Sequence, residues 1–151
     1  MIDGKDFKIL EILKVNCKLP SREISKLTGL PITTVHNRIK KMEKEGIIKS
    51  YVANVDDTKV GKNVQAFVQV RLKHVSPDST VDKLIHMREI SEVYVISGST
   101  DIMIKVSTKD VDSLQDFLLN KLSKMKGIER TDTSVVLKKV DKTKPNLLNV
   151  T

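Results

Sequence analysis

The stretch SREISKLTGLPITTVHNRIKKMEKEG, residues 21–46, has the hydrophobic pattern of a short helix, a tight turn and a longer helix. Gly29 suits the turn, because glycine readily adopts the left-handed conformation that ends a helix. Two amphipathic helices joined by such a turn are typical of the helix-turn-helix motif. We expect the buried side of the two helices to consist of Ile24, Leu27, Val35, Ile39 and Met42.

A further helix precedes this motif in residues 3–16, DGKDFKILEILKVN. Asp3 is placed as its N-cap, and Ser21 is placed to cap the helix that follows. Residues 1–50 therefore predict a compact, winged-helix-like helix-turn-helix domain. The expected buried face of the first helix consists of Phe7, Ile9, Leu10, Ile12 and Leu13.

The chain is most basic in its first third. It contains 27 Lys and Arg against 19 Asp and Glu, a formal net charge of +8, and residues 1–50 hold 11 of the basic and 6 of the acidic side chains. This balance favours an acidic partner such as nucleic acid or an anionic membrane surface. The alternative is a dimerisation module with a basic face that is only solvated.

The outward face of residues 31–46 supplies candidate DNA contacts, since an α-helix fits the major groove of duplex DNA. Short polar side chains near the start of the helix suit base edges, whereas longer cations suit phosphates. Ser21 and Arg22, at the start of the preceding helix, suit a further phosphate. The candidates for base edges are Thr33, Thr34, His36 and Asn37, and those for phosphates are Arg38, Lys40, Lys41 and Lys44.

Strands and helices mix in residues 64–140. The segment VQAFVQVRLKH, residues 64–74, alternates apolar and polar residues as a half-buried strand does. A helix, two strands, a helix and a last strand follow. This order predicts an α+β chain whose second domain is ferredoxin-like, βαββαβ, with an antiparallel sheet. Residues 51–63 are expected to form a strand and hinge linker, and residues 141–151 a C-terminal tail.

The sequence disfavours several other classes of protein. We find no phosphate-binding loop, metal-ligand spacing or His-carboxylate pair, which predicts no catalytic residues, no metal, no cofactor and no enzyme activity. Cys17, the single cysteine, is expected to be a small buried residue. No apolar run reaches the length of a membrane span, and the N-terminus is unlike a signal peptide, so we expect a cytoplasmic protein without a membrane partner.

Residues 7–56, FKILEILKVNCKLPSREISKLTGLPITTVHNRIKKMEKEGIIKSYVANVD, resemble the N-terminal signature of the Lrp/AsnC family of feast/famine transcriptional regulators. RIKKMEKEGIIKSY, residues 38–51, matches the family's pattern, and SGSTDIMIKV, residues 97–106, resembles its Gly-x-x-Asp turn. Pro31 departs from the serine that members commonly place there, which removes a hydroxyl contact. The resemblance implies a sequence-specific regulator that binds double-stranded DNA and an amino-acid or related effector, as a homodimer or as a tetramer or octamer.

The turn SGSTD, residues 97–101, is the candidate effector site. If the resemblance holds in detail, the Asp101 carboxylate binds the α-ammonium group of an amino acid. Glycine and aspartate are also ordinary turn residues, so a purely structural turn stays open. The alternative for the whole chain is a ferredoxin-like ligand-binding or structural oligomer whose basic N-terminal module binds nucleic acid non-specifically. The effector candidates are Ser97, Gly98, Ser99, Thr100, Asp101, Thr131, Thr133 and Ser134.

Overall fold

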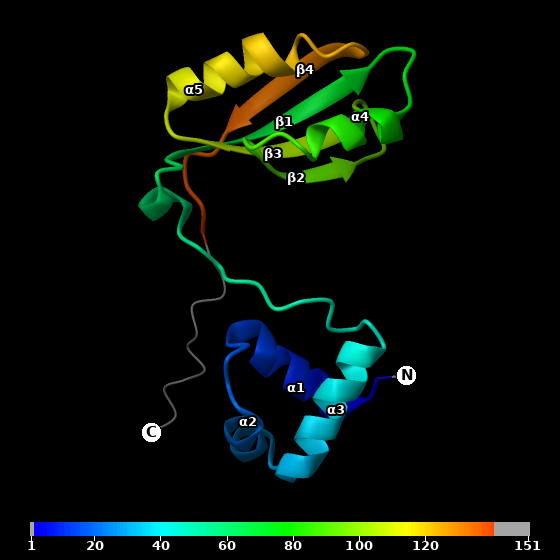
Figure 1. Cartoon of the computed structure of the whole chain (residues 1–151), viewed down its shortest axis with the longest axis vertical. Helices are drawn as coiled ribbons and strands as arrows, with labels where there is room; N and C mark the ends of the chain where they lie inside the picture. The colour runs from blue at the N-terminus through cyan, green and yellow to red at the C-terminus, as the bar shows by residue number, and fades with distance from the viewer. Residues whose placement is uncertain (1, 141–151) are drawn as a thin grey trace. The chain divides into compact units, whose positions relative to one another are not determined.

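The chain forms two compact units, one reaching to Asn54 and one over Val55–Val140 (Figure 1). The structure is a computed structural model and describes residues 2–140. The predicted tail at residues 141–151 therefore lies outside the described residues. Each unit has its own cluster of buried apolar side chains, so each has a hydrophobic core.

Three helices make up the N-terminal unit: α1 (Gly4–Val15), α2 (Ser21–Thr28) and α3 (Ile32–Lys44). Gly29 ends α2 in the left-handed conformation, with φ 71°. The apolar stripes of the helices meet in one core, which confirms the predicted helix-turn-helix domain. The core contains Ile9, Leu13, Ile24, Val35 and Met42, with Leu10, Ile12, Leu19, Leu30, Ile39 and Ile48 packed against it.

The helix ends confirm one capping prediction and correct another. Asp3 caps α1, since its side chain accepts from backbone N–H groups of the first turn. Pro20, not Ser21, is the N-cap of α2, and Ser21 already lies in the first helical turn. Phe7 and Leu27 were expected inside but are 55% and 53% exposed, because short helices around a small core bury only one stripe each.

Little regular structure follows α3. Residues 47–56 form neither helix nor strand, and Asp57–Val60 form one 3₁₀ turn, η1. No strand forms in residues 51–63 of the described chain, because an extended segment becomes a strand only where a second strand bonds to its backbone. Cys17, predicted to be buried, is exposed.

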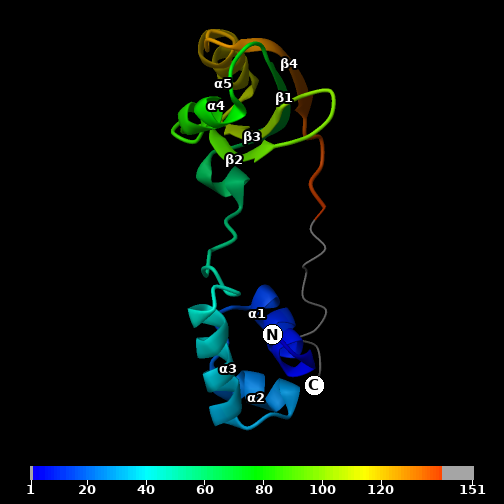
Figure 2. The ribbon, with the colours of Figure 1, turned by 90° about the vertical axis from the view of Figure 1, so that its right-hand side faces the viewer.

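The C-terminal unit is an antiparallel sheet with its helices on one face (Figure 2). The strands lie in the order β2-β3-β1-β4, so the two βαβ halves interleave. This arrangement confirms the predicted ferredoxin-like fold. The elements are β1 (Val64–Leu72), α4 (Pro77–Leu84), β2 (Ile90–Val95), β3 (Ile102–Thr108), α5 (Val111–Asp116), the π-helical segment η2 (Phe117–Leu122) that continues α5, and β4 (Ile128–Val135).

Alternation along the strands gives the sheet a helix-covered face and an open face. The side chains of Ala66, Val68 and Val70 in β1 are fully buried in the core. The intervening residues of β1 point to the opposite, open face, since successive side chains of a strand alternate. On the covered face the strands pack against Leu84, Leu114, Phe117 and Leu122 from the helices. The open face of β1 carries Gln65, Phe67, Gln69 and Arg71.

Candidate DNA-binding face and effector pocket

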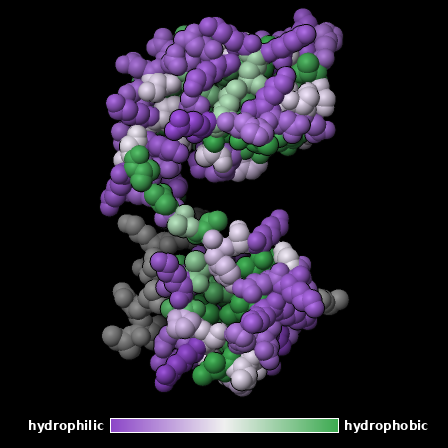
Figure 3. All heavy atoms as spheres, viewed as in Figure 1, coloured by the Kyte–Doolittle hydropathy of each residue, from purple (hydrophilic) through white to green (hydrophobic). Residues whose placement is uncertain are grey.

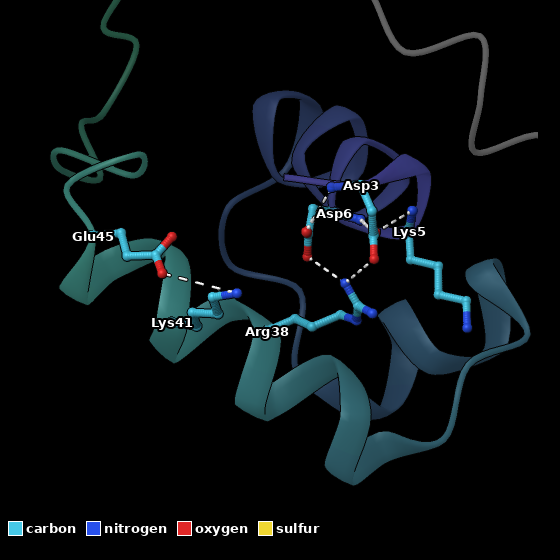
Figure 4. Close-up of polar contacts among 6 residues, drawn as sticks. All are labelled: Asp3, Lys5, Asp6, Arg38, Lys41 and Glu45. Carbon is cyan, nitrogen blue, oxygen red and sulfur yellow. Dashed lines mark hydrogen bonds and ion pairs between the residues drawn. The ribbon is translucent and has the colours of Figure 1, made fainter. Parts of the chain in front are cut away.

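Arg38 joins α3 to the start of α1 (Figure 4). Its Nη1 donates to Asp3 Oδ2 at 2.9 Å and to Asp6 Oδ1 at 2.8 Å. The Arg38 side chain is 25% exposed and that of Asp6 only 7%. The ion pairs therefore hold α3 against α1. Arg38 was predicted from sequence as a phosphate contact, but its guanidinium pairs with two carboxylates of its own domain. Removing it would leave the buried Asp6 carboxylate without its cation.

The same cluster lowers the pKa values of both carboxyl groups. The pKa of Asp6 is lowered first by the backbone N–H of Asp3 and further by the Arg38 guanidinium. The pKa of Asp3 is lowered chiefly by the backbone N–H of Asp6, with Arg38 again contributing. Both groups are therefore carboxylates at neutral pH. Each accepts hydrogen bonds from a backbone N–H and from Arg38, and protonation of the carboxylate would weaken these bonds.

The other candidates on α3 stay available. The side chains of His36, Asn37 and Lys40 are exposed and make no hydrogen bond or ion pair within the described residues. Lys41 lies 3.8 Å from Glu45, a contact between exposed groups that contributes little (Figure 4). Hydrophilic residues cover the α3 side of this unit in Figure 3. Thr33, Lys44 and Arg22 are also exposed, whereas Thr34 and Ser21 are half-buried.

The starts of α2 and α3 lack side-chain caps. Pro20 and Pro31 are their N-cap residues, and neither offers a side-chain acceptor. The earliest backbone donors of these helices found bonded are Glu23 in α2 and Val35 in α3. The N–H groups before them therefore point out of the helix ends with no acceptor in the described chain, and such groups bind phosphate well. In α1, by contrast, Asp3 occupies the corresponding donors.

In the C-terminal unit, Asp101 ties the 97–101 turn to β1. Its Oδ2 accepts from the backbone N–H of Leu72 at 2.7 Å, and its own N–H donates to the carbonyl of Val70 at 3.0 Å. Gly98 has φ 131°, a conformation that favours glycine. These contacts support the structural interpretation of Gly98 and Asp101 that the sequence left open.

A pocket of about 190 Å³ lies beside this turn. Arg71 Nε donates to the carbonyl of Ser99 at 3.0 Å and so fixes one wall. Of the predicted effector residues, only Ser99 and Thr100 line the pocket; Ser97, Gly98, Asp101, Thr131, Thr133 and Ser134 do not. The remaining lining comes from the open faces of β1 and β4: Gln69, Arg71, Arg130 and Asp132.

Strand register explains why the predicted hydroxyls miss this pocket. Thr131 and Thr133 pair with Val70 and Val68, whose side chains are buried in the helix-covered core. Directly opposed residues of an antiparallel pair share a face, so both threonines point away from the open face. Ser134 is on the open face but opposite Phe67, farther along the strand. The pocket residues that sequence analysis missed are Arg71, Arg130 and Asp132, which lie at alternate positions on the open faces of β1 and β4. The alternation of side chains along a strand could have pointed to them.

The pocket's charges are arranged unusually. Arg71 and Arg130 are directly opposed across β1 and β4, and neither has an ion pair among the described residues. Like charges placed opposite each other destabilise a sheet unless an anion lies between them. Asp132, one pair along and opposite Gln69, adds a carboxylate to the same pocket. The site can therefore hold a small molecule that carries both an acidic and a basic group.

The fold and these two faces define a helix-turn-helix DNA-binding transcriptional regulator with a separate ligand-binding domain. Two family models match the chain: "Winged helix-turn-helix DNA-binding" at residues 2–49 and "Lrp/AsnC ligand binding domain" at residues 65–146. The chain belongs to the Lrp/AsnC family.

Known proteins of similar sequence and structure agree. The HTH-type transcriptional regulator FL11 of Pyrococcus furiosus is 39% identical over 91% of both chains. The structure of E. coli AsnC is 34% identical with a TM-score of 0.82, covering 92% of this chain and 94% of that chain. A Neisseria meningitidis transcriptional regulator crystallised in complex with L-Met is 26% identical with a TM-score of 0.89, covering 99% and 98%.

Within residues 2–140, no helix is long and apolar enough to cross a membrane. Within the same range, no group of three or more His, Cys, Asp or Glu side chains is placed to hold a metal ion.

Proposed function

We propose that this chain is a sequence-specific transcriptional regulator that acts in the cytoplasm as a homodimer or larger homo-oligomer and responds to an amino acid. The observation that carries the DNA-binding part is the shared exposure of the α3 polar face and the uncapped starts of α2 and α3. Backbone N–H groups and lysines fix the protein on phosphates, while short side chains reach base edges. Two copies read two half-sites about one helical turn apart, or a multiple of it.

The exposed polar residues of α3 fall into two groups, those that suit base edges and those that suit phosphates. Thr33, His36 and Asn37 are exposed near the start of the helix, where base edges are contacted in such motifs. Lys40 and Lys44 are exposed farther along and suit phosphates. Asn37→Ala should therefore cost roughly 1–3 kcal/mol on the preferred site and little on random DNA. Equal losses on both would support the alternative of non-specific binding by the basic module.

The effector part rests on the opposed arginines. A ligand carboxylate between Arg71 and Arg130 relieves their repulsion, and its ammonium group reaches Asp132. The L-Met complex of the Neisseria relative supports an amino acid as the ligand class. Such a ligand changes DNA binding only if it prefers one assembly or conformation over another. Exposed aromatic side chains in β1 and β2, Phe67 and Tyr94, support contact with a second copy through the sheet.

The test is calorimetric titration of the twenty amino acids into wild type, Arg130→Gln and Lys83→Gln. Arg130→Gln should lose binding of the preferred amino acid at least tenfold, because it removes one of two cations from the carboxylate. Lys83→Gln removes an exposed cation of α4 outside the pocket and should bind as wild type does. Absence of binding by the wild type, or undiminished binding by Arg130→Gln, would refute the proposed effector site.

A further inference from the structure

The start of α3 carries no polar side chain. Pro31 is the N-cap of the helix and Ile32 is its first residue, and both side chains are exposed. Figure 1 shows this start as the lower end of α3. Neither side chain has a hydrogen-bond donor or acceptor, so the start of the helix differs from the polar face that continues from it.

Ile32 is not a core residue of the N-terminal unit. Its side chain is 49% exposed, although Val35, three residues further on, is fully buried. A hydrophobic staple at a helix start joins the residue before the N-cap to the fourth helical residue, and these are Leu30 and Val35. Val35 lies in the buried core and Leu30 packs against it. Ile32 is therefore not needed to close the start of α3.

Ile32 instead extends the exposed face of α3 that is proposed to read bases. Side chains four residues apart are neighbours on a helix surface, so Ile32 lies beside His36. Thr33 and Asn37 are related in the same way, and all of these side chains are exposed. The N-terminal residues of a recognition helix are the ones that contact base edges. A large apolar side chain therefore stands among the candidate base contacts.

Thymine is the base that offers a methyl group in the major groove. Its C5-methyl group lies there, whereas the features that distinguish the other bases are hydrogen-bond donors and acceptors. An isoleucine cannot bond to donors or acceptors, and covering them without replacing their water costs free energy. Covering a methyl group removes apolar surface from water and stabilises the complex.

We propose that Ile32 is a specificity-determining residue that selects a thymine in each half-site by packing against its C5-methyl group. The inference rests on the proposed function, since it requires that the start of α3 enters the major groove. Thr33, His36 and Asn37 then read neighbouring bases through hydrogen bonds. The apolar surface that Ile32 exposes in the free protein is covered when the DNA is bound.

The test replaces single thymines of the preferred duplex by deoxyuridine, which lacks the methyl group and keeps the hydrogen-bonding groups. The full-length wild type first selects that duplex from random sequences, and fluorescence anisotropy at constant salt gives the affinities. At one thymine per half-site, uracil should lower the affinity of the wild type about fourfold, because one methyl group loses its apolar contact.

Two serine variants complete the comparison. Ile32→Ser has no methyl group at this position and should bind the thymine and uracil duplexes equally, with the affinity that the wild type has for uracil. Ile85→Ser changes a comparably exposed isoleucine of the C-terminal unit, 56% exposed, and should respond to uracil as the wild type does. Both variants should unfold at the temperature of the wild type, since each alters an exposed side chain.

Each contrary outcome has a distinct meaning. Absence of any thymine at which uracil weakens the wild type, or equal sensitivity in Ile32→Ser, overturns the role of Ile32 and leaves sequence-specific binding by other residues intact. A lower unfolding temperature of Ile32→Ser, with equal losses on thymine and uracil duplexes, shows that Ile32 serves the fold and also overturns it. A selection that enriches no sequence refutes the proposed function, and this inference with it.

Discussion

Replacing Lys40 and Arg38 separately by glutamine should separate DNA affinity from domain stability, although both changes remove one positive charge from α3. Lys40 is exposed without a partner in the described chain, whereas Arg38 bridges Asp3 and Asp6. We therefore expect Lys40→Gln to weaken binding to all DNA sequences and leave thermal unfolding unchanged. Arg38→Gln should lower the unfolding temperature, because it leaves the buried Asp6 carboxylate without its cation.

The size of the DNA effect follows from counterion release. Each phosphate contact contributes about 0.9 to the slope of log affinity against log salt concentration. A dimer presents Lys40 twice, so Lys40→Gln should flatten the slope by about 1.8. Arg38→Gln should leave the slope unchanged at temperatures where the domain is folded, because its guanidinium is held by carboxylates and not by the DNA.

The assay is fluorescence-anisotropy titration of a duplex at several salt concentrations, with circular-dichroism melts of the same samples. Lys8→Gln provides the matched control, since it removes an exposed cation of α1. If Arg38→Gln flattens the salt slope as much as Lys40→Gln and melts as the wild type does, Arg38 is a phosphate contact and our assignment is wrong. An equal effect of Lys8→Gln would show that overall charge alone, without specific contacts, sets the slope.

Three further predictions concern stability. The lowered pKa values of Asp3 and Asp6 add stability that is complete above their ordinary value of 3.8 and is lost as the pH falls through the lowered values. The unfolding temperatures of wild type and Asp6→Asn should therefore differ at pH 7 and converge in acid. A difference that stays constant with pH would contradict this. In urea unfolding, Phe117→Ala should cost about 3–5 kcal/mol by opening a cavity in the core, against about 0.5 kcal/mol for the exposed Leu119→Ala, and similar losses would contradict the assigned burial. Gly98→Ala should cost about 1–3 kcal/mol from backbone conformation alone, since an added Cβ meets nothing within 4 Å, and unchanged unfolding would disprove that strain.

Local signals determined most of the fold. Hydrophobic periodicity, the Asp3 cap and the Gly29 stop each act within one or two turns of chain, so the three helices of the N-terminal unit could be predicted from neighbouring residues alone. The strict alternation of β1 likewise predicted which of its faces is buried. The order of elements then restricted the second unit to a ferredoxin-like arrangement.

Partners distant in sequence were decided only by the tertiary structure. Arg38 has the appearance of a DNA contact in its own helix, and only the packing of α3 on α1 brings it to Asp6, 32 residues away. Periodicity likewise predicted that Phe7 and Leu27 lie inside, but the extent of a buried stripe depends on which neighbours cover it, and they are exposed.

The residues of the proposed effector pocket could not be found from the sequence for the same kind of reason. Arg71 and Arg130 meet because of the β1–β4 register, which is fixed by pairing between strands far apart in the chain. That register also turns Thr131 and Thr133 to the helix-covered face, away from the predicted site. The sequence by itself determined the helices and strands, their order and the apolar or polar character of each face, because these follow from short-range periodicity. Only the tertiary structure decided which side chains meet across elements, because those contacts depend on packing and strand register.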